Sequence, residues 1–351
     1  MTDLSALVCP VPLPATDRVQ LAHGGGGRLM HELLRTVIQP ALGLDPDGLH
    51  LDAAVLPAPP PGARLALTTD TYVVHPLQFP GGDIGSLAVH GTVNDLACVG
   101  ARPAWMSVGL VIEEGLPVAT LRSLLTSMGR AAEAAGIVIV TGDTKVVERG
   151  KADGLFINTA GVGFVDAGVA LSPAAMEPGD RLVINGDLGR HGIAIMAARE
   201  HLAFDTTLTS DSAPLAELVL ALLEAGVRLR CVRDLTRGGL ATVLVELAEQ
   251  SRRSLLLHEP AVPLDPQVAG ACAILGLDPL YVANEGRLVA VVAAEDADAA
   301  VAVMRRFEVG AGACVVGEVR LEGTVGVGVR GALGAVRRVE RLSGEQLPRI
   351  C

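Results

Sequence analysis

The fold is decided by a stretch that begins with LALTTDTYVV at residues 65–74. Its apolar and β-branched residues predict a strand, and an acidic residue, Asp70, breaks the apolar run near its end. The next segment, IGSLAVHGTVNDLACVG at 84–100, has helical spacing and small residues, and AWMSVGLVI at 104–112 returns to strand composition. This succession of strand, helix and strand indicates a fold of the α/β class.

Outward from this stretch, helices and strands continue to alternate, although acidic loops interrupt them too often for a simple doubly wound sheet. A second block begins with LSPAAMEPGDRLVING at 171–186. The expected helices include 28–42, 118–136 and 239–251, and the expected strands include 137–147, 154–165 and 313–320. The predicted parts are a glycine-rich segment with a helix (1–40), a first domain (41–168), a second α/β domain (169–330) and a mobile tail without an apolar period (331–351).

The composition limits the classes of function. A chain of 351 residues, of which 50% are hydrophobic, is long enough for two cores. The net charge of -11 and the lack of a basic stripe argue against a nucleic-acid partner. The N-terminal residues lack the pattern of a secretory signal and the apolar runs are strand-sized, so we expect a cytoplasmic protein that does not enter a membrane. The six cysteines are then expected to be reduced thiols.

Five acidic residues stand at the edges of apolar segments, where an isolated carboxylate is costly unless it is paired or binds a metal. Each of them alone is better interpreted as a helix cap or turn residue. Together they favour a site for Mg²⁺ and phosphate, because Mg²⁺ prefers hard oxygen ligands and takes phosphate oxygens as well. These residues are Asp52, Asp70, Asp95, Asp143 and Asp234.

Glycine-rich turns add possible anion sites. The run Gly24, Gly25, Gly26 and Gly27 directly precedes the expected helix at 28–42, where free N–H groups can hold an anion, although a flexible hinge would look the same. GDLGRHG (186–192) and RDLTRGG (233–239) repeat an Asp-Leu-x-Arg-x-Gly pattern, so that Arg237 is a candidate for a phosphate-binding cation. An ordinary pair of capped helices is the alternative.

Three further residues are candidates for catalysis. Lys145 is one of only two lysines and follows Asp143 by two positions, so that both side chains face the same way on a strand. Glu285, in YVANEGRLVAVV (281–292), precedes an apolar strand. A surface ion pair and a simple turn residue are the respective alternatives. The chain closes with EQLPRIC, which puts the thiol of Cys351 on a segment that is expected to be mobile.

These motifs, taken in order from HGGGGRLMHELL to the final PRIC, resemble the HypE family of hydrogenase maturation factors, the carbamoyl dehydratases. The glycine and aspartate motifs alone indicate only the wider superfamily of aminoimidazole ribonucleotide synthetase, selenophosphate synthetase and thiamine-monophosphate kinase. The terminal Pro-Arg-Ile-Cys separates the family from these relatives. The resemblance implies two α/β domains, with the first domain pairing with its twin to form a homodimer around a shared β-barrel.

The resemblance also implies a reaction. HypF would place a carbamoyl group on Cys351, an ATP-dependent dehydration would convert it to a thiocyanate, and the cyanide would pass to iron on the HypC–HypD complex. ATP and Mg²⁺ would bind between the domains, with Asp52, Asp70, Asp95 and Asp234 on the metal side. Glu285 and Lys145 would be base and charge partner, in an order that the sequence leaves open, and Asp143 would contact either the metal or Lys145. A metabolite kinase or synthetase and a non-enzymatic nucleotide-binding scaffold are the competing hypotheses.

Overall fold

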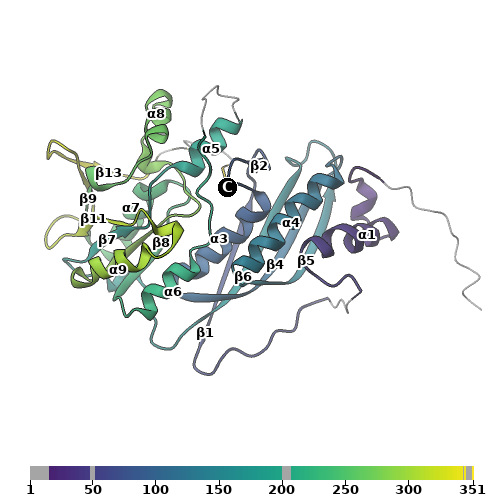
Figure 1. Ribbon diagram of the computed structural model, residues 1–351, viewed down its shortest axis with the longest axis horizontal. Helices are drawn as coiled ribbons and strands as arrows, with labels where there is room; N and C mark the ends of the chain where they lie inside the picture. The colour runs from purple at the N-terminus through teal and green to yellow at the C-terminus, as the bar shows by residue number, and fades with distance from the viewer. Residues whose placement is uncertain (1–15, 48–51, 200–206, 343, 345–349) are drawn as a thin grey trace, which may run out of the picture.

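Two β-sheets with their helices form the two ends of the molecule, and the C-terminus lies between them (Figure 1). The structure is a computed structural model, and it describes residues 16–47, 52–199, 207–342, 344 and 350–351. This arrangement confirms the predicted α/β fold with two domains. None of the helices in the described ranges has the length and apolar character needed to cross a membrane.

The first domain is built on a four-stranded sheet. Its strands are β1 (Arg64–Tyr72), β4 (Ala101–Glu113), β5 (Val138–Val147) and β6 (Leu155–Val165), in the order β1-β6-β4-β5. β4 and β5 are parallel, and the other pairs are antiparallel. A small hairpin of β2 (Gln78–Phe79) and β3 (Gly82–Asp83) connects β1 to the first long helix.

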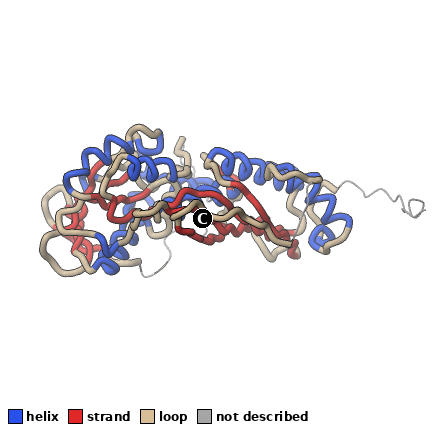
Figure 2. Tube along the Cα trace, turned by 90° about the horizontal axis from the view of Figure 1, so that it is seen from below, coloured by secondary structure: helices blue, strands red, loops and turns tan. Residues whose placement is uncertain are grey.

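The helices α3 (Ile84–Cys98) and α4 (Val118–Ala134) cover one face of this sheet and leave the other face open (Figure 2). α3 begins at Asp83, whose side chain accepts a hydrogen bond from the backbone N–H of Ser86 at 2.9 Å. Small residues allow α3 to be buried on nearly all sides, since a Cβ on Gly85 would lie 2.2 Å from the carbonyl oxygen of Leu124. α3 is therefore a central element that contacts both domains.

The open face carries a continuous apolar row. Its residues are Leu67, Val162, Trp105 and Val138, which are paired across all four strands. Leu67 is 76% exposed and Val138 is 58% exposed. Apolar side chains aligned on a sheet face are the pattern of a surface that is covered by another layer.

The segment before β1 forms a helix interrupted by a π-helical turn. It consists of α1 (Arg28–Leu33), the π-helix Leu34–Ile38 and α2 (Gln39–Ala41), which together match the expected helix at 28–42. The glycine run lies just before it, as predicted, and Gly27 is the N-cap of α1. Gly24 packs against the edge strand β5, where a Cβ would lie 2.9 Å from the backbone nitrogen of Val146. Only glycine permits this close approach.

The second domain contains a seven-stranded sheet in the order β13-β12-β9-β11-β7-β10-β8. Its strands are β7 (Arg181–Ile184), β8 (Leu229–Asp234), β9 (Ser254–His258), β10 (Leu288–Val292), β11 (Cys314–Val319), β12 (Gly326–Arg330) and β13 (Val336–Val339). Its helices are α5 (Arg190–Arg199), α6 (Ala216–Glu224), α7 (Gly239–Ser251), α8 (Pro266–Leu275) and α9 (Ala297–Met304). Every residue of β10 is buried, because α7 packs on one face of the sheet and α6 and α9 on the other.

β13 corrects the predicted start of the tail at residue 331. The strand pairs with β12, and Val339 is 3% exposed in the core of the second domain. No clear apolar period is visible there because two arginines, Arg337 and Arg338, separate the only valines of a four-residue strand. Of the terminal motif PRIC, residues 348 and 349 lie outside the described residues, whereas Ile350 and Cys351 are described.

Candidate active site

The last two residues of the chain are docked between the two domains. The backbone N–H of Val73, at the end of β1, donates to the carbonyl oxygen of Cys351 at 3.2 Å. Nε2 of His191, on α5, lies 2.6 Å from the carbonyl oxygen of Ile350. Ile350 is 5% exposed, so the apolar side chain before the cysteine is buried. In this docked position the thiol of Cys351 faces acidic groups of both domains.

Glu285 is a buried carboxyl group in this cleft. It lies in the turn before β10, where its side chain is 3% exposed and its Oε1 has no hydrogen-bond partner within the described residues. The turn is held by both domains, since the amide of Asn94 donates to the carbonyl oxygen of Glu285 at 3.2 Å and the N–H of Glu285 donates to Asp211 at 3.3 Å. Burial, reinforced by the charges of Asp234 and Asp211, raises the pKa of Glu285 well above its ordinary value. A buried carboxyl group with an unpartnered oxygen is suited to meet a ligand.

Three of the predicted metal ligands lie in the same cleft. Asp70 is on β1, Asp95 on α3 and Asp234 at the end of β8. The hydroxyl of Thr68 donates to Asp95 at 2.7 Å. Burial, followed by the charge of Asp95 and with a smaller effect of Asp70, raises the pKa of Asp234 to about 7. The structure therefore brings these three carboxylates together, although they are far apart in the sequence.

Burial also raises the pKa of the Cys351 thiol to about 12, and the charge of Glu285 is the next largest cause. The guanidinium of Arg237 opposes this shift, and it lowers the pKa of Glu285 in the same way. Arg237 thus acts on the thiol and on the buried carboxyl together, while its role as a phosphate-binding cation stays a prediction. The docked sulfur is a protonated thiol at neutral pH and not a thiolate.

Asp143 and Lys145 lie on the open face of the first sheet, opposite the face that α3 and α4 cover. Their side chains face the same way on β5, as predicted, and Nζ of Lys145 lies 2.8 Å from Asp143. Asp143 pairs with Gly109, and Gly109 pairs with the exposed Asn158 on the open face. Within the one chain that is described, Lys145 is therefore separated from Glu285 and Cys351 by the sheet. The Lys145 ammonium lowers the pKa of Asp143.

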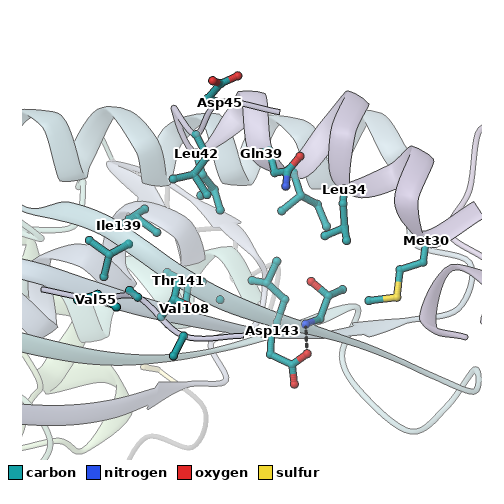
Figure 3. A pocket seen from close by; sticks show the side chains of 18 of the residues that line it. Met30, Leu34, Gln39, Leu42, Asp45, Val55, Val108, Ile139, Thr141 and Asp143 are labelled. Atoms are coloured by element: carbon teal, nitrogen blue, oxygen red, sulfur yellow. Dashed lines mark hydrogen bonds between the residues drawn. The ribbon is translucent and has the colours of Figure 1, made fainter. Parts of the chain in front are cut away.

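A cavity of about 690 Å³ lies beside this pair, between the helix at 28–42 and the strands β4 and β5. Figure 3 shows Met30, Leu34 and Leu42 of the helix facing Val108 and Ile139 of the strands, while the carboxylate of Asp143 is directed away from the helix. Of the glycine run, Gly24 packs against the same edge strand. Of the residues predicted to bind the nucleotide, Asp143 lines this cavity, whereas Gly24 to Gly27 and Arg237 are not among its lining residues.

Asp52 does not join the other predicted metal ligands. It is exposed and makes no hydrogen bond or ion pair within the described ranges, although the next residues, Ala53 to Leu56, line the cavity. Across the part of the chain that the structure describes, no three His, Cys, Asp or Glu side chains are arranged to hold a metal ion. Asp70, Asp95 and Asp234 supply the oxygen chemistry that Mg²⁺ prefers, but they do not form a closed cage without further ligands.

Sequence reasoning missed several residues of the cleft. Ser210 and Asp211 contact His191 and the backbone of Glu285, and the hydroxyl of Tyr72 is buried without a partner within the described residues. Tyr72 has the composition of an ordinary strand residue, and nothing in its sequence context distinguishes it. The polar run TSDS at 209–212 was the only available signal for the serine and the aspartate.

Comparison with known proteins identifies the family. Models of AIR synthase related proteins match the chain, the N-terminal domain over residues 50–165 and the C-terminal domain over residues 177–330. The carbamoyl dehydratase HypE of Rhodobacter capsulatus is 51% identical to this chain over 337 residues, which cover 95% of this chain and 98% of that protein. The chain belongs to the HypE family. The resemblance drawn from the sequence motifs is thereby confirmed.

Solved structures of the HypE family have the same fold as this chain. A hydrogenase maturation protein HypE in complex with ATP matches with a TM-score of 0.88 and 45% identity, over 95% of this chain and 99% of that chain. A HypE–HypF complex matches with a TM-score of 0.77 and 44% identity, over 79% of this chain and 90% of that chain. The fold described above is thus the fold of the HypE family over nearly the whole chain.

Proposed function

We propose that this chain is an ATP-dependent carbamoyl dehydratase of [NiFe]-hydrogenase maturation, which converts a carbamoyl group on its own Cys351 to a thiocyanate. The observation that carries the proposal is the docked terminal thiol beside the buried carboxyl group of Glu285, in a member of the HypE family. The thiocyanate is then a donor of cyanide for the iron centre.

The state of the docked thiol supports an order of events. With a pKa of about 12, the sulfur of Cys351 is a poor nucleophile in the cleft, since the thiolate is the reactive form. We infer that the sulfur receives its carbamoyl group outside the cleft, from HypF. The S-carbamoyl sulfur carries no proton and no charge, so it docks without the cost of burying a thiolate.

The chemical step needs a better leaving group than an amide oxygen. The carbonyl oxygen of the carbamoyl group takes the γ-phosphoryl group of ATP and ADP leaves. The C–O bond then breaks, phosphate departs with that oxygen, and nitrogen loses both of its protons as the C≡N bond forms. Phosphoryl transfer itself requires mainly alignment and charge neutralisation.

We assign the base to Glu285 and the role of charge partner to Lys145. Glu285 lies near the sulfur, and its raised pKa makes its carboxylate a strong base once the proton has left. It takes one proton from nitrogen in each turnover, and the departing phosphate takes the other. Arg237 stabilises the negative charge of the carboxylate and of the phosphorylated intermediate. Lys145, paired with Asp143 on the open sheet face, is kept as the proposed charge partner, although no contact within the described residues brings it to the cavity or to Glu285.

ATP and Mg²⁺ are assigned to the two gathered sets of residues. The cavity between the helix at 28–42 and the strands β4 and β5 is proposed for the nucleotide because apolar side chains line most of it, and Gly24, which packs on β5, brings the predicted glycine run to the same strand. Asp70, Asp95 and Asp234 are proposed to hold Mg²⁺, which supplies charge neutralisation for the phosphates when bound. Asp52 is kept as a fourth candidate ligand that would have to move to reach them.

The proposal includes partners and location. The apolar row on the open sheet face is suited to pair with the same face of a second copy, which would close a shared β-barrel and make a homodimer. HypF is the proposed carbamoyl donor, and the HypC–HypD complex is the proposed acceptor of cyanide. We expect the protein to act in the cytoplasm, without contact with nucleic acid or membrane.

The decisive experiment measures the mass of the C-terminal peptide. The full-length protein is incubated with ATP, Mg²⁺ and the carbamoyl donor system, and a protease that cleaves after Glu345 releases residues 346–351. We expect a carbamoyl adduct that converts to a species roughly 25 Da heavier than the free thiol, the mass change for S–H to S–CN. Cys351→Ser should carry neither adduct, and Glu285→Gln should accumulate the carbamoyl adduct.

Two results would overturn the proposal. ATP turnover that is stimulated by a free metabolite and unaffected by Cys351→Ser would identify a kinase or synthetase. Nucleotide binding without hydrolysis, even with the carbamoylated thiol, would identify a scaffold.

A further inference from the structure

His191 occupies an unusual position at the start of α5. Its imidazole is fully buried, with an exposed fraction of 0%, and it packs edge-on against the ring of Phe79 with 5.5 Å between the ring centroids. Nε2 lies 2.6 Å from the carbonyl oxygen of Ile350, and Nδ1 lies 2.8 Å from Oγ of Ser210. Both ring nitrogens are therefore used, and one of them contacts the tail.

These contacts have only one consistent direction for a neutral ring. A carbonyl oxygen only accepts, so Nε2 of His191 carries the proton and donates to Ile350. Nδ1 is then the acceptor, and the hydroxyl of Ser210 donates to it. Oγ of Ser210 in turn accepts from the backbone N–H of Ser212 at 3.1 Å. The series runs from the Ser212 amide through Ser210 and His191 to the tail, and each group in it is satisfied.

This hydrogen-bond network is held in place by both domains. The backbone N–H of Ser210 donates to the carbonyl oxygen of Pro80 at 2.8 Å, next to Phe79 of the first domain. A Cβ on Gly81 would lie 2.8 Å from the nitrogen of Ser210, so the two segments are in close contact. His191 itself belongs to the second domain. Its Nε2 therefore has a fixed position relative to Val73, which binds the next carbonyl of the tail.

We propose that His191 is a positioning residue that sets how deeply the tail enters the cleft, by holding the backbone carbonyl of Ile350, and that Ser210 fixes the tautomer that His191 needs. The second domain binds the carbonyl of Ile350 and the first domain binds the carbonyl of Cys351. The sulfur of Cys351 is therefore held at one distance inside the cleft. The docking role stands on these contacts alone. Its effect on catalysis rests on the proposed function, because only a dehydratase acting on Cys351 needs that depth.

The docking role is tested by the reactivity of the thiol. The full-length protein, without nucleotide, is treated with iodoacetamide, and alkylation of Cys351 is followed by mass on the peptide 346–351. The chain unfolded in urea gives the rate of an unprotected thiol. We expect the folded wild type to be protected against alkylation. His191→Phe, which keeps a ring against Phe79, should react about tenfold faster, since losing one hydrogen bond to a buried carbonyl changes an equilibrium by about this factor.

Conservative variants separate positioning from packing. His191→Gln has an amide that can donate to Ile350 and accept from Ser210, so it should restore most of the protection. Ser210→Ala should increase alkylation about threefold, because the tautomer is no longer fixed. Ser212→Ala is the matched control. It removes the contact between Oγ of Ser212 and Nδ1 of His90 at 2.9 Å but keeps the backbone N–H that Ser210 uses, so alkylation should stay at the wild-type rate.

Several results would overturn the inference. These are a wild-type thiol that reacts as fast as the unfolded chain, a folded His191→Phe variant that reacts at the wild-type rate, and equal effects of the two serine variants. If His191→Phe does not fold, the serine pair decides alone. Failure of the proposed function is recognised separately, because it removes the thiocyanate from wild type while the protection of Cys351 persists. Where both hold, His191→Phe should lower the single-turnover rate of dehydration about tenfold and should not slow carbamoylation by the donor system, which acts on the undocked tail.

Discussion

Two histidines, the half-buried His90 and the buried His191, illustrate how similar residues differ in what they do. His90, on α3, and His191, on α5, each bind a serine of the segment 207–216 through Nδ1. His191 also donates to the tail, whereas His90 has no second hydrogen-bond partner within the described residues. Burial lowers the pKa of His90 to about 4, from an ordinary value of 6.5. His90 therefore affects stability through its protonation and not through the tail.

The pKa of His90 predicts how stability depends on pH. The unfolded chain binds a proton at this residue below pH 6.5 and the folded chain only near pH 4, so the free energy of unfolding should fall as the pH is lowered through this window. Each pKa unit is worth about 1.4 kcal/mol. His90→Gln, which can still bind Ser212, should lose less stability between pH 6.5 and pH 4 than wild type. Urea unfolding at both pH values measures the difference, and parallel losses in the two proteins would contradict the prediction.

Among the elements, the four-stranded sheet has the clearest unexplained surface. The row of Leu67, Val162, Trp105 and Val138 crosses the open face, and the ring of Trp105 packs edge-on against Phe164 at 5.1 Å. The sequence could predict these strands because each is long and apolar. It could not predict β13, which is only four residues long, nor the separation of Lys145 from Glu285, which depends on strand order and register. Alternation along β5 placed Asp143 and Lys145 together but did not specify which face they share.

The open face predicts a self-association that one charge should disrupt. Leu67→Glu should convert a dimer to a monomer with little loss of monomer stability, because Leu67 is 76% exposed in the single chain. Sedimentation or light scattering measures the mass. Leu333→Glu is the control, since Leu333 is 99% exposed on the distant turn between β12 and β13. A wild-type monomer, or a Leu67→Glu variant that stays dimeric, would be incompatible with a dimer formed by this face.

At the scale of the whole molecule, Asn94 joins the two domains. This residue of α3 is 2% exposed, and its side chain donates to the carbonyl oxygens of Ala213 and Glu285 and accepts from the N–H of Leu215. Three backbone groups of the second domain thus depend on one amide of the first. The sequence offered the neighbouring Asp95 as a candidate and gave no reason to select Asn94, because its role follows only from the contact between domains.

Loss of this amide should uncouple the domains. Asn94→Ala leaves three buried backbone groups unpaired, and we expect a loss of about 2–4 kcal/mol in the free energy of unfolding. The fluorescence of Trp105, the single tryptophan, reports the first domain, and far-ultraviolet circular dichroism reports both. The two urea transitions should coincide in wild type and separate in Asn94→Ala.

Asn158→Ala provides the comparison for this variant. The Asn158 amide donates to the carbonyl oxygen of Asp70 and to Thr71 within the first sheet. Its loss should weaken the first domain but leave the contact between the domains intact, so the two urea transitions should still coincide. Coincident transitions in Asn94→Ala would show that the amide does not couple the domains.

The segment at 210–212 has a consequence for how the chain can vary. Its three consecutive side chains reach three different targets, which are His191, the amide of Glu285 and His90. An inserted or deleted residue would shift all three out of phase at once, whereas a single replacement disturbs only one. We therefore expect homologues to keep the length of this segment fixed even where its letters change, and to vary in length instead at the exposed proline-rich loop 57–62.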